Sequence, residues 1–271
     1  MDLGVLTIAQ NSSVDYVKLA YQQCRSLKTC SDLPYAVVTD QRTKDDMPAS
    51  ALELFDHVVV ISDDLAAMQD WKLNNECQLF KLTPFRETLK VEADLVFTGS
   101  IDHWWRALRY RNMVVSQGCV DHLGRSATDR SQRRAFDANT LPDVYTGLMY
   151  WRRSQEAFLL FNTVRALQDN WQEVRKELKS VGELERSTTP STDLIFALAI
   201  RMLGPETYTL PIDWFRMVHM KPSVCSLPDP MVPCLDQLGW SINDQGMVIA
   251  GHQQRHPVHH HHKEFSHDRW L

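Results

Sequence analysis

Short β-prone runs alternate with helical patterns along the first hundred residues, and this alternation constrains the fold more than any other feature. Residues 5–9, 35–39, 57–61 and 88–91 are apolar runs bounded by polar or Pro-containing segments. Between the first two runs, residues 14–27 carry apolar side chains at roughly helical spacing. Strands joined through helical connections pair in parallel within one sheet. The sequence therefore predicts an α/β fold that opens with a parallel sheet.

Two carboxylates follow the fourth of these runs. Glu92 and Asp94 stand directly before a further apolar run, residues 95–97. In an extended chain, residues two apart project to the same side, so both acids are expected to face one point. Carboxylate oxygens are the ligands that hard divalent cations prefer. Because ligands gather at the carboxyl ends of strands in open parallel sheets, Gln10, Asn11 and Asp40 are expected near the same point.

Composition is that of an ordinary globular protein. The chain has 271 residues, is 44% hydrophobic and 23% charged, and its net charge of −5 gives no overall nucleic-acid footprint. No apolar run approaches the roughly 20 residues of a membrane-spanning helix, and the first residues lack a signal-peptide pattern. The six cysteines form no Cys-x-x-Cys pair. These features predict a cytoplasmic protein with reduced thiols and no membrane partner.

One segment, residues 105–134, is basic within this acidic chain. It holds seven arginines and two aspartates, and seven minus two leaves a local excess near +5. The arginines are Arg106, Arg109, Arg111, Arg125, Arg130, Arg133 and Arg134. Arginines contact nucleic-acid phosphates, and nearby aromatic rings stack on an extruded base. A solvated basic face is the simpler alternative, and the residues leave both interpretations open.

The second half of the chain predicts two helices, over residues 154–179 and 192–202. Ser191 or Thr192 is expected to cap the second helix, with Asp193 in its first turn. The last third lacks periodicity, so no elements are predicted there. Its histidines, at positions 252, 256, 259–262 and 267, are interpreted as a solvated terminus that collects adventitious metal, in preference to a ligand contact.

The carboxylate segment carries a family resemblance. Glu92-Ala-Asp94 resembles the Asp-x-Asp motif of nucleotide-sugar glycosyltransferases with the GT-A fold. Its flanks, residues 83–89 and 100–102, are similar to the glycogenin-like branch of that superfamily. The resemblance implies a GT-A-type, Rossmann-like mixed sheet flanked by helices in a single compact domain. Residues 1–105 would form the nucleotide-sugar-binding half, and residues 106–271 the acceptor-binding half and a C-terminal closing segment.

The same resemblance implies a metal and a donor. Residues 218–222, Val-His-Met-Lys-Pro, resemble the end of the branch's catalytic domain. Glu92, Asp94 and His219 would then hold Mn²⁺ or Mg²⁺, and Lys221 would meet the diphosphate of a nucleotide-sugar, with UDP as the expected nucleotide. The remaining donor-binding residues implied are Thr7, Ala9, Gln10, Asn11, Tyr16 and Asp40, with Tyr16 stacking on the base. A helix capped by Ser12, Ser13 or Asp15 explains the same stretch without a ligand.

The acceptor side is implied by residues 141–154, where Tyr145-Thr146-Gly147 stands in place of the usual Asn-Ser-Gly. The acceptor-binding residues implied are Arg125, Arg130, Arg133, Arg134, Tyr145 and Gly147. A turn before a core strand is enough to explain Gly147 by itself. Asp193 resembles the acid presented to the donor sugar, and Asp137, Asp143 and Asp193 are the candidate general bases.

As a whole, the chain resembles compact glycosyltransferases of tailed bacteriophages. Together with the basic segment, this implies transfer of a sugar to a hydroxymethylated pyrimidine in DNA. One alternative keeps the donor chemistry but uses a glycan, lipid-linked or protein acceptor. Another is a non-enzymatic DNA-binding protein on a degenerate GT-A scaffold, for which Glu92 in place of Asp is the main support. Neither the sugar nor an oligomeric state follows from the residues.

Overall fold

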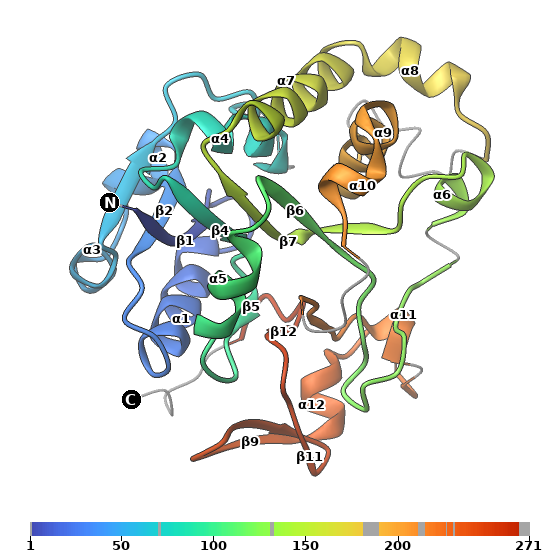
Figure 1. The fold of residues 1–271 in the computed structure, drawn as a ribbon. Coiled ribbons are helices and arrows are strands. Elements are labelled where there is room, and N and C mark those ends of the chain that lie inside the picture. The colour runs from blue at the N-terminus through green and yellow to red at the C-terminus, as the bar shows by residue number, and fades with distance from the viewer. Residues whose placement is uncertain are drawn as a thin grey trace.

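A six-stranded mixed sheet forms the centre of the molecule, in the order β3-β2-β1-β4-β7-β6 (Figure 1). The structure is a computed structural model that describes residues 2–69, 72–130, 133–180, 190–210, 215–225, 227–229 and 231–265. The strands are β1 Leu3–Ile8, β2 Tyr35–Thr39, β3 His57–Val60, β4 Glu87–Val91, β6 Met113–Gln117 and β7 Val144–Arg152. Strands β1 to β4 are parallel to one another, whereas β7 runs antiparallel to both β4 and β6. The predicted α/β fold with a mixed sheet is confirmed.

Alternate residues of each strand serve two hydrophobic cores, because side chains alternate across a sheet. In β7, Leu148 and Tyr150 belong to one core, while Met149 and Trp151 belong to the other. The first core is closed by helix α1 (Tyr16–Lys28), and the second by α7 (Gln155–Asp169) and α9 (Thr192–Leu203), on the opposite face (Figure 1). With both faces covered, the carboxyl ends of the parallel strands are where a ligand can enter.

The remaining helices are short: α2 Gln41–Asp45, α3 Ala49–Leu54, the 3₁₀ helix η1 Lys72–Gln78, α4 Leu79–Leu82, α5 Asp102–Leu108, α6 Arg134–Ala138, α8 Trp171–Glu177, α10 Pro205–Tyr208, α11 Pro222–Cys225 and α12 Cys234–Leu238. The helix predicted over residues 154–179 is two helices, α7 and α8, because the backbone of Asn170 leaves the helical conformation between them. Within the described residues, no helix is long and apolar enough to cross a membrane. All six cysteines are free thiols.

Two small sheets, which periodicity did not predict, involve the last part of the chain. Strands β9 Trp240–Asn243, β10 Gly246–Ile249 and β11 His252–Gln253 form an antiparallel sheet. In the other sheet, β12 (Val258–His259) lies between β5 (Leu95–Val96) and β8 (Val218–His219). His259 pairs with Leu95 on one side and with His219 on the other. The C-terminal segment is therefore held against the turn that follows β4.

Candidate active site

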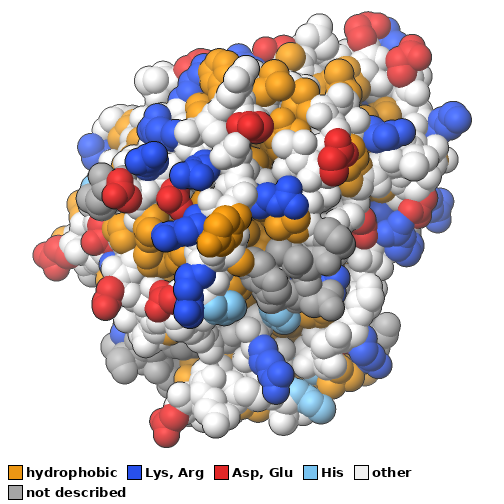
Figure 2. Space-filling view, in the orientation of Figure 1, with side chains coloured by type: hydrophobic (Ala, Val, Ile, Leu, Met, Phe, Trp, Pro, Cys, Tyr) orange, Lys and Arg blue, Asp and Glu red, His pale blue; other side chains and the backbone are white. Residues whose placement is uncertain are grey.

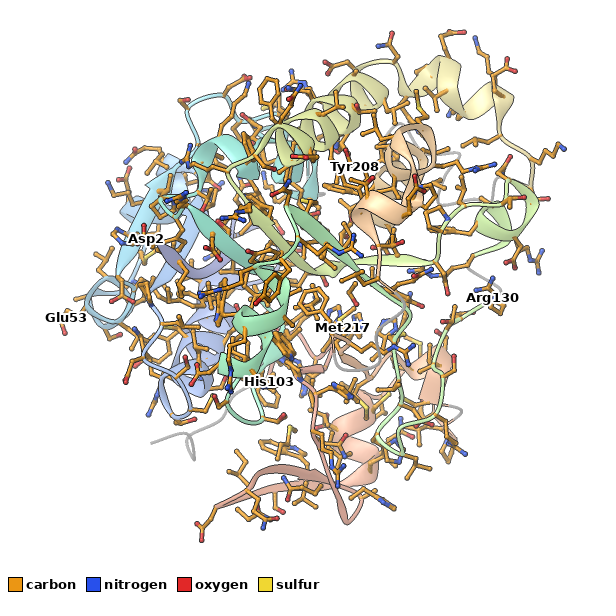
Figure 3. All side chains as sticks on the ribbon, in the orientation of Figure 1. Asp2, Glu53, His103, Arg130, Tyr208 and Met217 are labelled. Atoms are coloured by element: carbon orange, nitrogen blue, oxygen red, sulfur yellow. The ribbon has the colours of Figure 1, made fainter. Side chains whose placement is uncertain are left out.

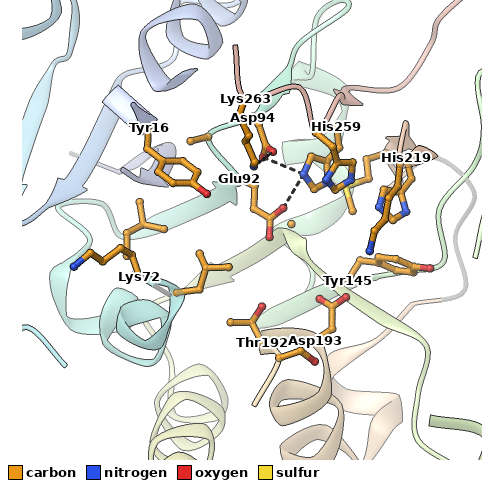
Figure 4. Close-up of a pocket in the computed structure, with 18 of the residues that line it drawn as sticks. Tyr16, Lys72, Glu92, Asp94, Tyr145, Thr192, Asp193, His219, His259 and Lys263 are labelled. Atoms are coloured by element: carbon orange, nitrogen blue, oxygen red, sulfur yellow. Dashed lines mark hydrogen bonds and ion pairs between the residues drawn. The ribbon is translucent and has the colours of Figure 1, made fainter. Parts of the chain in front are cut away.

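A cavity of about 390 Å³ lies at the carboxyl ends of β1 and β4 (Figure 4). Its walls come from both halves of the chain. The first half contributes β1, α1, η1 and the turn between β4 and β5, and the second half contributes α6, β7, α9, β8 and the segment from β12 onwards. The position agrees with the sequence-based expectation of a ligand site at the strand ends.

Glu92 and Asp94 lie in a tight turn, not in an extended chain. The amide of Leu95 donates to the carbonyl of Glu92 at 3.1 Å and closes this turn. The buried side-chain amide of Gln23, on α1, donates to the carbonyls of both Glu92 and Leu95 and so ties the turn to the helix. The expected geometry, two acids on one face of a strand, is therefore wrong. The two carboxylates converge because the turn places both of them around one imidazole.

That imidazole is His259. Its Nε2 lies 3.0 Å from Glu92 Oε2 and 3.0 Å from Asp94 Oδ1 (Figure 4). The second carboxylate oxygen of Asp94, Oδ2, accepts from the Lys263 ammonium at 2.6 Å. The ligand atoms of Glu92, Asp94 and His259 all lie within 4.8 Å of one another. The structure thus assembles two carboxylates, an imidazole and an ammonium on one side of the cavity.

The charges of these groups shift one another's pKa values. Burial opposes ionisation of Asp94, but His259 and Lys263 outweigh it and hold the pKa of Asp94 well below its usual range. Burial likewise opposes the charge on His259, but Asp94 and Glu92 raise the pKa of that imidazole. His219 has no such carboxylate contact, and burial together with His259 lowers its pKa to about 3. His259 therefore favours the cationic form beside the acids, whereas His219 is neutral.

The histidine assignment from sequence differs from this geometry. His219 was the expected partner of Glu92 and Asp94, but its ring stacks behind that of His259, with the ring centroids 5.6 Å apart. The interpretation of residues 259–262 as a solvated terminus is wrong, since His259 and His260 are 5% and 1% exposed. Sequence reasoning missed His259 and Lys263 as site residues. Both sit in a His-then-Lys order like that of residues 219–221, which was the available signal.

Gly147, on β7, lies against Glu92. Its carbonyl accepts from the amide of Glu92 at 3.1 Å. A Cβ added at this position would lie 3.2 Å from Glu92 Oε2 and 3.1 Å from the terminal methyl of Met217. Both contacts are closer than ordinary side-chain packing. The structure therefore shows Gly147 making room for the Glu92 carboxylate, a contact that its predicted acceptor-side role did not include.

Asp193 lies across the cavity and is held from several directions. Ser191 caps α9 and Asp193 occupies its first turn, as predicted. One carboxylate oxygen accepts from the amide and hydroxyl of Thr146, at 2.8 and 2.9 Å. The other accepts from Arg133 at 2.6 Å. Because both oxygens are engaged, the geometry suits a fixed acceptor of a hydrogen bond better than a mobile base.

Of the predicted donor-binding residues, Gln10, Tyr16 and Lys221 line the cavity. Gln10 joins a network in which its amide nitrogen donates to carboxylates of Asp40 and Asp64, at 3.1 and 3.2 Å. Burial is the main cause that lowers the pKa of Lys221.

The other four predicted donor residues, Thr7, Ala9, Asn11 and Asp40, do not line the cavity. Thr7 and Ala9 are fully buried. The side-chain oxygen of Asn11 accepts from the amide of Val17 at the start of α1, and Asp40 caps α2. Asp15 caps helix α1, so the alternative explanation of the stretch before this helix, a capped helix start without a ligand, agrees with the structure.

Three of the seven arginines of the basic segment, Arg125, Arg130 and Arg133, pair with acids. Arg125 contacts Asp121 at 2.7 Å, and Arg130 contacts Asp137 and also Asp143, at 3.2 Å from the latter. Figure 3 places Arg130 at the periphery, apart from Met217 in the cavity wall. Neither Asp137 nor Asp143 lines the cavity, so these two candidate bases lie outside the wall that contains Glu92 and Asp94.

Arg133 is the one predicted acceptor arginine that lines the cavity. It is 6% exposed, pairs with Asp143 at 2.9 Å and stacks over the ring of Tyr145 at 3.7 Å. Arg134 is exposed and outside the cavity lining. On the face in Figure 2, basic side chains are interspersed with acidic and hydrophobic ones. The local excess counted along the chain is therefore reduced in space by aspartates from later segments.

A scan against models of protein families finds no match, and a search of curated proteins finds none. Among solved structures, the chain is similar to mouse xyloside xylosyltransferase 1, at 14% identity and a TM-score of 0.48, over 77% of this chain and 84% of that one. It is similar to the galactosyltransferase LgtC in complex with donor and acceptor sugar analogs, at 9% identity and a TM-score of 0.43, over 67% of each chain. It is also similar to the glycosyltransferase GlyE of Streptococcus pneumoniae TIGR4, at 12% identity and a TM-score of 0.47, over 78% of this chain and 45% of that one. At this level the likeness is one of chain path, so a function must be argued from the cavity.

Proposed function

We propose that the chain is a GT-A-type glycosyltransferase that uses Mn²⁺ or Mg²⁺ to transfer a sugar from a nucleotide diphosphate. The meeting of Glu92, Asp94 and His259 at the end of β4 carries this proposal. Two carboxylates and one imidazole suit Mn²⁺ in particular, since that ion accepts oxygen and nitrogen ligands. The bound ion would act as a Lewis acid toward the leaving diphosphate.

The donor side is argued from Tyr16 and Lys263. The ammonium of Lys263 lies 5.2 Å from the centre of the Tyr16 ring and 2.6 Å from Asp94. A diphosphate joins a base, which would stack on Tyr16, to a sugar near the carboxylates, so Lys263 lies where the phosphates would pass. Lys263 would then offset the negative charge that develops as the glycosidic bond breaks. Although it lies in the predicted acceptor half, residues 106–271, Lys263 would complete the donor site of residues 1–105.

The sugar is expected to lie between Glu92 and Asp193, because these acids occupy opposite walls of one cavity (Figure 4). With Arg133 and Thr146 fixing both of its oxygens, Asp193 can accept a hydrogen bond from a sugar hydroxyl and stabilise positive charge at the anomeric carbon. The acceptor hydroxyl would attack the anomeric carbon as the bond between this carbon and the donor's phosphate oxygen breaks. If configuration is retained, the departing phosphate oxygen is the group that takes the proton.

For the acceptor, we propose a hydroxymethylated pyrimidine in DNA, modified in the cytoplasm of a phage-infected cell. The resemblance to phage enzymes supports this choice, as does the aromatic side chain of Tyr145 in the wall of the cavity that an extruded base would enter. Exposed Arg125, Arg130 and Arg134 would contact phosphates. The pairing of Arg125 and Arg130 with aspartates instead favours the second candidate, a glycan, lipid-linked or protein acceptor.

The experiment incubates the protein with Mn²⁺, a panel of UDP-sugars and DNA containing hydroxymethylcytosine, and measures both released UDP and the masses of the nucleosides. A sugar-sized mass increment that is lost in Asp94→Asn is the expected result. Metal-dependent UDP release without an increment would retain the transferase and exclude this acceptor. If no donor gives UDP or a product, the proposed reaction is wrong.

A further inference from the structure

Three histidine rings, of His219, His259 and His261, lie together on one side of the cavity. Their ligand nitrogens all lie within 4.8 Å of one another. The ring centroid of His261 is 3.8 Å from that of His259 and 4.7 Å from that of His219. This cluster shares only His259 with the carboxylate group.

Two nitrogens of the cluster have no hydrogen-bond partner among the described residues, although both are buried. They are Nδ1 of His259 and Nε2 of His261. Nε2 of His259 is already beside Glu92 and Asp94, so the orphaned nitrogen is on the other side of the same ring. His219 directs Nδ1 to the thiol of Cys119, at 3.3 Å, which leaves its Nε2 for another partner. Buried polar atoms are almost always paired, so orphaned imidazole nitrogens point to a ligand.

The backbone of His261 is strained in a way that brings its ring into this cluster. Its φ is +55°, in the left-handed region that non-glycine residues adopt at a cost of about 1–2 kcal/mol. Residues two apart in an extended strand are separated by about 7 Å. The rings of His259 and His261 are much closer than that, because the chain turns sharply after β12. Strain of this kind persists where the surroundings hold it, and it concentrates at functional sites.

We propose that His219, His259 and His261 form a second metal site, for a nitrogen-preferring transition metal ion such as Zn²⁺. Three histidines with one position left to solvent are a ligand set that Zn²⁺ accepts. With zinc on Nδ1, the Nε2–H of His259 would donate to the carboxylates of Glu92 and Asp94, so the two metal sites would compete for this imidazole. This site does not depend on sugar transfer, since it follows from the three rings alone.

The test measures Zn²⁺ affinity in protein that carries no affinity tag and has been stripped with a chelator. Zn²⁺ is titrated against a chromophoric competing chelator, and the stoichiometry and Kd are compared among variants. His261→Asn removes one ligand but retains a residue type that tolerates a positive φ. His262→Asn is the matched control, because His262 is the next residue of the same tract and is not a member of the cluster. Asp94→Asn reports on the carboxylate site.

We expect one Zn²⁺ per wild-type chain, with affinity weakened about tenfold or more in His261→Asn and retained in His262→Asn and Asp94→Asn. Equal binding by wild type and His261→Asn would overturn the proposal. Equal weakening in His261→Asn and His262→Asn would also overturn it, because it would mean adventitious binding to the tract. Loss of zinc in Asp94→Asn alone would place the ion at the carboxylates, and circular dichroism of each variant checks that the fold is retained.

Discussion

Adding one methyl group at Gly147 should impair the carboxylate site while leaving the fold intact. The new Cβ of Gly147→Ala would lie 3.2 Å from Glu92 Oε2, the same oxygen that contacts His259. The φ of Gly147 is not in the left-handed region, so the backbone accepts alanine. Both atoms that the methyl meets, in Glu92 and Met217, are at the ends of side chains and can move.

The magnitude follows from these contacts. To relieve a contact of 3.2 Å, the carboxylate must move by a few tenths of an ångström. Metal–ligand distances tolerate only about 0.2 Å, so we expect a Kd for Mn²⁺ about tenfold higher, or about 1.4 kcal/mol. Overpacking costs about 1–3 kcal/mol of stability, and replacing glycine restores about 0.4–1 kcal/mol through the unfolded chain. The net loss of stability should therefore be about 1 kcal/mol.

Free Mn²⁺ measured by electron paramagnetic resonance gives the affinity, and urea unfolding of metal-free protein gives the stability. Gly99→Ala is the matched control, because its Cβ would meet no atom within 4 Å. If Gly147→Ala and Gly99→Ala bind Mn²⁺ with the same affinity, the reasoning that connects Gly147 to the Glu92 carboxylate is refuted.

Two further predictions concern stability. Lys90 and Glu76 form a fully buried ion pair, so Lys90→Met should lower the free energy of unfolding by about 3–5 kcal/mol, because it leaves the Glu76 charge unpaired. Urea unfolding should show a smaller loss of stability in the double variant Lys90→Met/Glu76→Leu. A larger loss in the double variant than in Lys90→Met would contradict this reasoning. Burial lowers the pKa of His219 and of His260 to about 3, and that of His261 well below its usual value. Because the unfolded chain binds these protons below about pH 6.5 and the native chain does not, the contribution of these three rings to metal-free stability should be full above that pH and fall as the pH drops. The slope should reach about 1.4 kcal/mol per pH unit for each histidine, and urea unfolding between about pH 7 and pH 5 that shows no slope would exclude the neutral buried rings.

The strands and principal helices could be predicted because local patterns decide them. The run at residues 35–39 coincides with β2, and Ser191 caps α9 where the residue types require it. The break at Asn170 was missed, since apolar spacing continues across it and only the backbone conformation shows the end of α7.

Which side chains contact one another in the site was predicted less well, because these contacts join residues distant in sequence. The charge counted along residues 105–134 does not tell which arginines are paired, since Arg133 meets Asp193 from 60 residues away. The histidine beside Glu92 and Asp94 was expected at position 219 by its order before a lysine, an order that position 259 also offers.

The sequence by itself determined the alternation of strands and helices and the placing of Glu92 and Asp94 directly after a strand, because both depend on residues close together in the chain. Only the tertiary structure decided which imidazole and which ammonium meet them. Lys263 reaches Asp94 across 169 residues, and His259 reaches both acids because β12 pairs between β5 and β8. Strand register between distant segments sets these contacts, and no local pattern encodes that register.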